Sequence, residues 1–84
     1  MHAPPETLDL LDDLLIEIRA RAWLVERKRG IFYRKSVGWL HFHGKPGAVH
    51  ADLKVGRDWI RYPANTPGEW RRLLAALDHS APAA

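Results

Sequence analysis

Residues 39–54 have the sequence WLHFHGKPGAVHADLK, and this stretch decides the fold. Apolar and polar side chains alternate on both sides of a Gly-Lys-Pro-Gly segment, which is typical of two antiparallel strands joined by a tight turn. The apolar positions share one face: Leu40, Phe42, Val49, Ala51 and Leu53. We therefore predict that this face covers a core and that the opposite, polar face carries any specific function.

Helices are predicted on both sides of this hairpin. Apolar residues recur at three- and four-residue spacing through residues 6–22, which predicts an amphipathic N-terminal helix. A second helix is predicted over residues 67–78. Its start has the pattern of a capping box, with Thr66 at the N-cap, Pro67 in the first turn and Glu69 reaching back.

The central part of the chain predicts a meander of short strands. We expect strands at about 31–35, 39–43, 48–55 and 59–62, separated by glycine-containing turns. Residues 25–29 fit either a further strand or an extension of the helix. The order predicts an α+β two-layer sandwich, in which an N-terminal helix, an antiparallel meander of three or four strands and a C-terminal helix follow one another, with both helices on one sheet face.

Length and composition bound the class of protein. The 84 residues predict a single domain over 1–84, with an ordered body at about 5–78 and a flexible tail at 79–84. There is no cysteine, which excludes disulfides and sulfur-based zinc sites. No apolar run approaches the roughly 20 residues that span a bilayer, so no membrane association is expected. A cytoplasmic bacterial protein is the default expectation.

Charge is distributed unevenly along the chain. The net charge is +3, and acidic residues at 6–17 are followed by basic residues at 19–35. This asymmetry is compatible with an anion-binding surface. It is more simply explained by the helix dipole, which favours acids early and bases late in a helix and needs no ligand.

The open face of the sheet gathers the candidate site. Its predicted members, all binding-site candidates, are Trp39, His41, His43, His50, Asp52, Lys54, Trp59 and Arg61. Turn geometry is expected to place His41 opposite His50 and Trp39 opposite Asp52, about 5 Å apart at Cβ. The next turn is expected to pair Asp52 with Arg61 and Lys54 with Trp59.

Several functions compete for this face. An open sheet face rich in Trp, His and Arg has the composition of a protein interface, so a non-catalytic interaction module, self-associating or binding a protein partner, is the first hypothesis. Aromatic and basic side chains together also suit single-stranded nucleic acid or another anion. The third hypothesis is a divalent metal site, with candidate ligands His41, His43, His50 and Asp52.

Catalysis is not predicted. The chain has few nucleophiles, and neither a glycine-rich phosphate loop nor a Ser- or Cys-centred motif occurs. No organic cofactor is expected, and no catalytic residue is assigned.

The runs FYRKS at 32–36, LHFH at 40–43 and ADLK at 51–54 resemble a group of small bacterial proteins that share this signature. The resemblance covers roughly residues 25–78 and includes the capped C-terminal helix. It implies the α+β fold and directs attention to His41, His43 and Asp52. It implies no activity.

Overall fold

The computed structural model describes residues 2–82 and confirms an α+β fold. Its elements follow in the order α1 (Pro5–Asp9), α2 (Asp12–Arg19), β1 (Val25–Lys28), β2 (Ile31–Arg34), β3 (Val37–Lys45), β4 (Ala48–Val55), β5 (Asp58–Pro63) and α3 (Pro67–Ser80). The strands form one open antiparallel sheet in the order β1-β2-β3-β4-β5, so every strand pairs with its neighbour in sequence.

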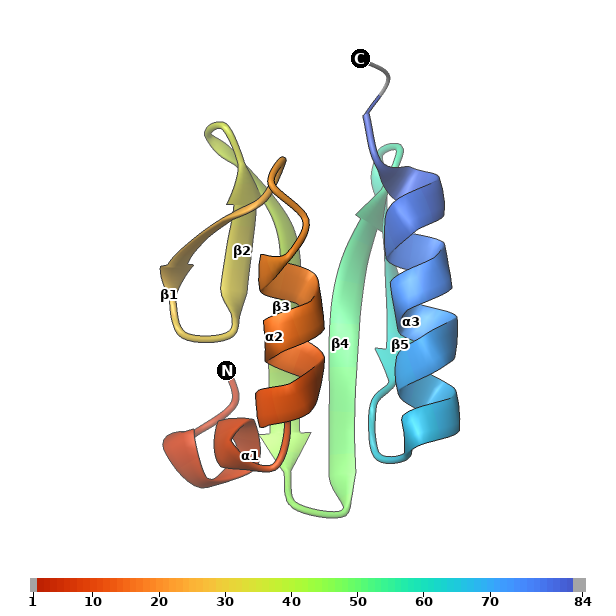
Figure 1. Cartoon of the computed structure of the whole chain (residues 1–84). Helices are drawn as coiled ribbons and strands as arrows, with labels where there is room; N and C mark the ends of the chain where they lie inside the picture. Colours follow the sequence, from red (N-terminus) through yellow and green to blue (C-terminus); the bar gives the residue numbers. More distant parts are fainter. Residues whose placement is uncertain (1, 83–84) are drawn as a thin grey trace.

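The two longer helices cover one face of this sheet. Figure 1 shows α2 and α3 side by side in front of the strands, with β4 visible between them. The core contains the apolar residues predicted from the hairpin together with Phe32 and leucines from both helices. An ion pair of 2.9 Å between Arg21 and Asp78 links the segment that follows α2 to the last turns of α3. Within residues 2–82 no helix is both long and apolar enough to cross a membrane.

The prediction of one continuous N-terminal helix over residues 6–22 is wrong. Two helices form instead, because the backbone tightens after α1: the Leu10 and Leu11 amides donate to carbonyls three residues earlier. The break leaves Leu10 58% exposed while Leu11 is buried. The helix also ends earlier than predicted, at Arg19, and residues 25–28, left undecided by the sequence, form strand β1.

The N-terminal segment pairs with β3 before α1 begins. The Ala3 amide donates to the Phe42 carbonyl at 2.9 Å, at a position of β3 beyond its last pairing with β2. Ala3 is 9% exposed and belongs to the core, whereas His2 contacts the histidines of the open face. The segment therefore delivers His2 to the face opposite the helices.

A β-bulge at the start of β3 changes the direction of Trp39. Phe32 pairs with Leu40 but Tyr33 pairs with Gly38, so Trp39 is an extra residue on β3. The Trp39 Nε1–H donates to the Ser80 hydroxyl at 3.2 Å, and its ring packs edge-on against Trp23. The expectation that Trp39 lies on the open face is wrong, because the bulge turns this side chain toward the helices.

The register of the central hairpin also differs from the expectation. Gly44 remains in β3 with a φ of +101°, where an added Cβ would meet the Ala48 carbonyl oxygen at 2.1 Å. The turn therefore contains only residues 46–47, and Lys45 pairs with Ala48. His41 is opposite Asp52 rather than His50. The change is two positions along β4, so every side chain keeps its face.

The capping box at the start of α3 is confirmed. The Thr66 hydroxyl accepts the Glu69 amide at 3.2 Å, and the Glu69 carboxylate accepts the Asn65 amide at 2.7 Å. The helix continues to Ser80, two residues beyond its predicted end at 78. The last two positions of the predicted flexible tail, 83–84, lie outside the described residues.

Candidate metal site on the open sheet face

Three adjacent strands build the candidate site. His41 and His43 come from β3, His50 and Asp52 from β4, and Arg61 from β5. Alternation along each strand puts these side chains on the face away from the helices. Across the ladders, His41 is opposite Asp52 and Asp52 is opposite Arg61, the second pair as predicted. His43 is opposite His50.

Three potential ligand atoms converge at the centre of this group. His41 Nδ1 and His43 Nε2 are 2.7 Å apart, and His43 Nε2 is 3.2 Å from Asp52 Oδ2. One ligand atom from each of His41, His43 and Asp52 lies within 4.8 Å of the other two. The His43 and Asp52 side chains are only 16% and 15% exposed. The convergence is therefore partly enclosed and held by cross-strand pairing.

Asp52 is held in its ionised form by Arg61. The Arg61 guanidinium donates to both carboxylate oxygens, at 3.1 and 3.5 Å. Burial alone would raise the pKa of Asp52, but the hydrogen bond and positive charge of Arg61 outweigh burial and lower it below its usual value. The site therefore contains a carboxylate near neutral pH.

Three imidazoles near this carboxylate, those of His2, His41 and His50, favour their neutral form. Burial, followed by the neighbouring His43, lowers the pKa of His41. Burial and Arg61 lower the pKa of His50, and burial and His43 lower that of His2. Neutral imidazole is the form that donates a lone pair to a metal ion.

Two further histidines, His2 and His50, stack on the ring of His43. The ring of His43 is nearly parallel to that of His2, with centroids 5.4 Å apart, and to that of His50, with centroids 5.3 Å apart. His50 Nε2 is buried and has no hydrogen-bond partner within the part of the chain that is described. A buried polar atom without a partner is costly, which makes this nitrogen available for a proton or a ligand.

The remaining predicted site residues lie at the margin of this cluster. The Trp59 ring, 46% exposed, is 4.8 Å from the His41 ring, and the Lys54 ammonium lies over it at 5.6 Å. Trp39 is not among them, because it faces the helices. The structure thus brings together seven of the eight candidates: His41, His43, His50, Asp52, Lys54, Trp59 and Arg61.

His2 is the residue that sequence reasoning missed. It stands far from the hairpin in sequence, and the run His-Ala-Pro-Pro carries no strand periodicity. Its place depends on one long-range backbone hydrogen bond, from Ala3 to Phe42. No local sequence pattern predicts such a long-range contact.

Comparison of the chain with protein-family models, with curated proteins and with solved structures gave no match.

Proposed function

We propose that this domain binds a divalent transition-metal ion through His41 Nδ1, His43 Nε2 and Asp52. The observation that carries the proposal is the convergence of these three atoms within 4.8 Å. Two imidazole nitrogens and one carboxylate oxygen suit Zn²⁺, Ni²⁺ or Fe²⁺ better than Mg²⁺ or Ca²⁺, which prefer oxygen ligands.

The distances require little rearrangement. Zinc binds His nitrogen and carboxylate oxygen at about 2.0–2.2 Å, which places tetrahedral ligand atoms about 3.3 Å apart. The separation of 3.2 Å between His43 Nε2 and Asp52 Oδ2 is close to that value. His41 Nδ1 and His43 Nε2, which are 2.7 Å apart, would have to separate by about 0.6 Å. Rotation of His2, which already touches both ligand rings, would supply a fourth nitrogen.

A shared proton is the competing explanation for the same geometry. A hydrogen bond between His41 and His43, with Asp52 as a second acceptor, also brings these atoms together. A metal ion competes with that proton for the same lone pairs, so the two explanations differ in what zinc does to the protein.

Calorimetric titration of the chelator-treated protein with Zn²⁺ tests the proposal. We expect saturable binding of one ion per chain, with proton release in buffers of different ionisation enthalpy. Removal of a ligand in His43→Ala should weaken binding by more than the roughly 10- to 100-fold that loss of an outer hydrogen-bond partner of a metal ligand typically costs.

The matched control is His79→Ala. His79 lies in the last turn of α3 on the helix side, and its loss should leave zinc affinity unchanged. Absence of saturable binding, or equal weakening by both substitutions, would show that the cluster is a hydrogen-bonded group and no metal site.

Self-association through β5 is a second candidate function, favoured by its exposed apolar side chains. β5 is an edge strand, and Trp59, Ile60 and the neighbouring Val55 are 46%, 40% and 38% exposed. Antiparallel pairing of β5 with β5 of a second copy would continue the sheet and cover these side chains. In sedimentation experiments we expect a dimer that Ile60→Lys dissociates, and a monomeric wild type at high concentration would refute it.

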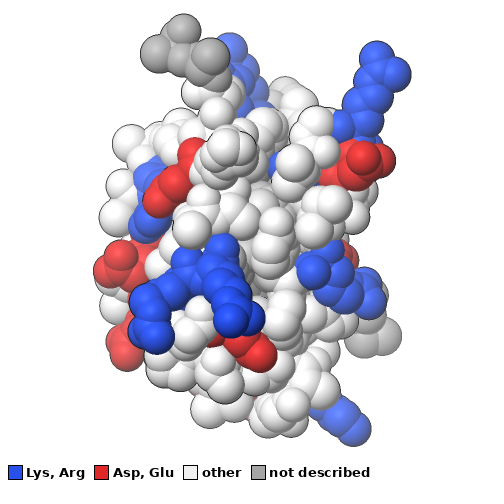
Figure 2. Space-filling view, turned by 90° about the vertical axis from the view of Figure 1, so that its right-hand side faces the viewer, with Lys and Arg blue, Asp and Glu red and all other residues white. Residues whose placement is uncertain are grey.

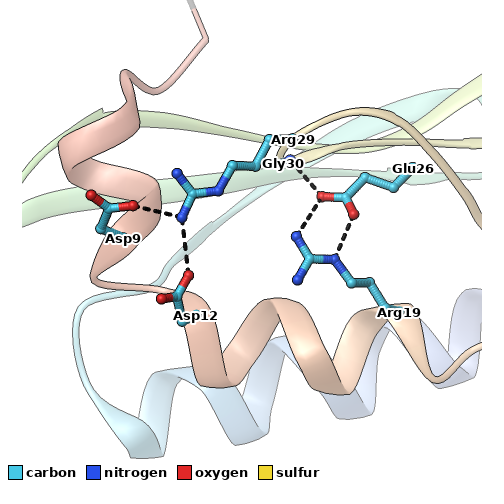
Figure 3. Close-up of polar contacts among 6 residues, drawn as sticks. All are labelled: Asp9, Asp12, Arg19, Glu26, Arg29 and Gly30. Atoms are coloured by element: carbon cyan, nitrogen blue, oxygen red, sulfur yellow. Dashed lines mark hydrogen bonds and ion pairs between the residues drawn. The ribbon is translucent and has the colours of Figure 1, made fainter.

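The nucleic-acid hypothesis has weaker support. Trp39 faces the helices, and Arg61 is paired with Asp52. Arg29 bridges Asp9 and Asp12, and Arg19 pairs with Glu26 (Figure 3). On the side of the molecule seen in Figure 2, basic side chains form separate groups with acids among them rather than one continuous surface. We therefore do not propose that this domain binds single-stranded nucleic acid.

A further inference from the structure

A cavity beside the histidines is lined by three cationic side chains. Its volume is about 440 Å³, and the lining residues are His2, Ala3, Arg27, Lys28, Arg29, Ile31 and Tyr33. Among residues 2–82, no acidic residue lines it. The volume lies within the roughly 300–1,000 Å³ typical of small-molecule sites.

The three cations differ in how much of their charge is neutralised. Arg29 Nη2 donates to Asp9 at 2.7 Å and to Asp12 at 3.0 Å, so this side chain is held in place and its charge is balanced (Figure 3). Arg27 pairs with no carboxylate in the described chain and donates only to the Lys35 carbonyl. The Lys28 ammonium group makes no hydrogen bond or ion pair with residues 2–82. Two positive charges in the cavity are thus unbalanced.

The other walls suit an organic group. Tyr33 lies under the Arg27 guanidinium, 4.7 Å from ring centroid to Cζ, which orients that cation. Ile31 adds an apolar contact and is opposite His41 in the β2–β3 ladder. Negatively charged oxygen atoms of a ligand would contact Arg27 and Lys28, while a ring or chain attached to them would lie against Tyr33 and Ile31.

We infer that this cavity binds a small organic phosphate monoester, with the phosphate on Arg27 and Lys28. A phosphate monoester carries about −1.5 to −2 charges at pH 7, which matches two unbalanced cations better than a single carboxylate does. Arginine and lysine are the side chains that bind phosphate oxygens most effectively. The site does not require the metal ion, because His41, His43 and Asp52 are not among its lining residues.

Titration of chelator-treated protein with phenyl phosphate, followed by amide NMR shifts at about 0.1 M salt, tests the inference. We expect saturable shifts centred on residues 27–33 and weaker binding of benzoate, which has the same ring but one charge. Inorganic phosphate should shift the same amides with lower affinity, because it lacks the ring.

Charge-removing variants give the decisive comparison. Arg27→Gln and Lys28→Gln should each weaken phenyl phosphate binding by about 10-fold or more, the cost of one charged hydrogen bond. Arg57→Gln is the matched control, because it removes the same charge from the exposed β4–β5 turn. Equal effects of the three substitutions, or shifts centred away from residues 2–3 and 27–33, would overturn the inference. The zinc titration tests His43, which does not line this cavity, so either proposal can fail alone.

Discussion

The Asn65 side chain hydrogen-bonds to the backbone of β4 at a position beyond the end of β5. We expect its removal to lower the free energy of unfolding. The Val49 amide donates to Asn65 Oδ1 at 2.7 Å, and Asn65 Nδ2 donates to the Val49 carbonyl at 3.2 Å. The side-chain amide thereby replaces a strand partner for a residue that is only 4% exposed. Asn65→Ala removes both hydrogen bonds and leaves the backbone amide of residue 65, which caps against Glu69, in place.

Two hydrogen bonds at about 0.5–1.5 kcal/mol each give an expected loss of about 2 kcal/mol in the free energy of unfolding. For a domain of this size that corresponds to a fall in Tm of about 8–16 °C. Urea unfolding followed by tryptophan fluorescence measures the change, with Ser36→Ala in the exposed β2–β3 turn as the control. A loss below about 0.5 kcal/mol, or an equal loss in the control, would refute the reasoning.

Three further predictions concern the cap, the bulge and the histidines. Thr66→Ala should cost about 1 kcal/mol in urea unfolding, because the Glu69 amide loses its acceptor; an unchanged midpoint would contradict the cap. Trp39→Phe should lower the free energy of unfolding by about 1 kcal/mol, because the hydrogen bond to Ser80 is lost, and should leave zinc affinity the same. An altered zinc affinity would contradict the placement of this side chain toward the helices. Metal-free protein should lose stability as the pH falls, because burial lowers the pKa of His41 in the folded state below its unfolded value of about 6.5. The contribution of neutral His41 to the free energy of unfolding is therefore fully present above about pH 6.5 and is lost as the pH falls through the folded pKa. Urea midpoints at several pH values between about 8 and 5 test this, and a midpoint that rises on acidification would contradict it.

Periodicity predicted the layers of the fold because it records burial. The alternation in residues 39–55 and the capping box at Thr66 depend on neighbours only a few residues away, and both are confirmed. The break between α1 and α2 was missed because the apolar stripe continues through Leu11, although the backbone tightens there. Strand β1 was left undecided because most of the VERK segment is exposed and shows no alternation.

The candidate site was predictable as far as it depends on alternation. Seven of eight proposed residues share the open face because a shift of two positions preserves side-chain direction. Trp39 was misplaced because a bulge adds one residue and so reverses direction at that point. His2 reaches the cluster only through a contact between the N-terminal segment and β3, which no local pattern encodes.

Long-range ¹H–¹⁵N spectra of the histidine side chains, with and without one equivalent of Zn²⁺, test the metal-site proposal most directly because they report each ring nitrogen separately. We predict that zinc changes the ¹⁵N shifts of His41 Nδ1 and His43 Nε2 to metal-bound values, while His79 on α3 is unaffected. Zinc that leaves both nitrogens unchanged, or that shifts all five histidines alike, would contradict a metal site at His41, His43 and Asp52.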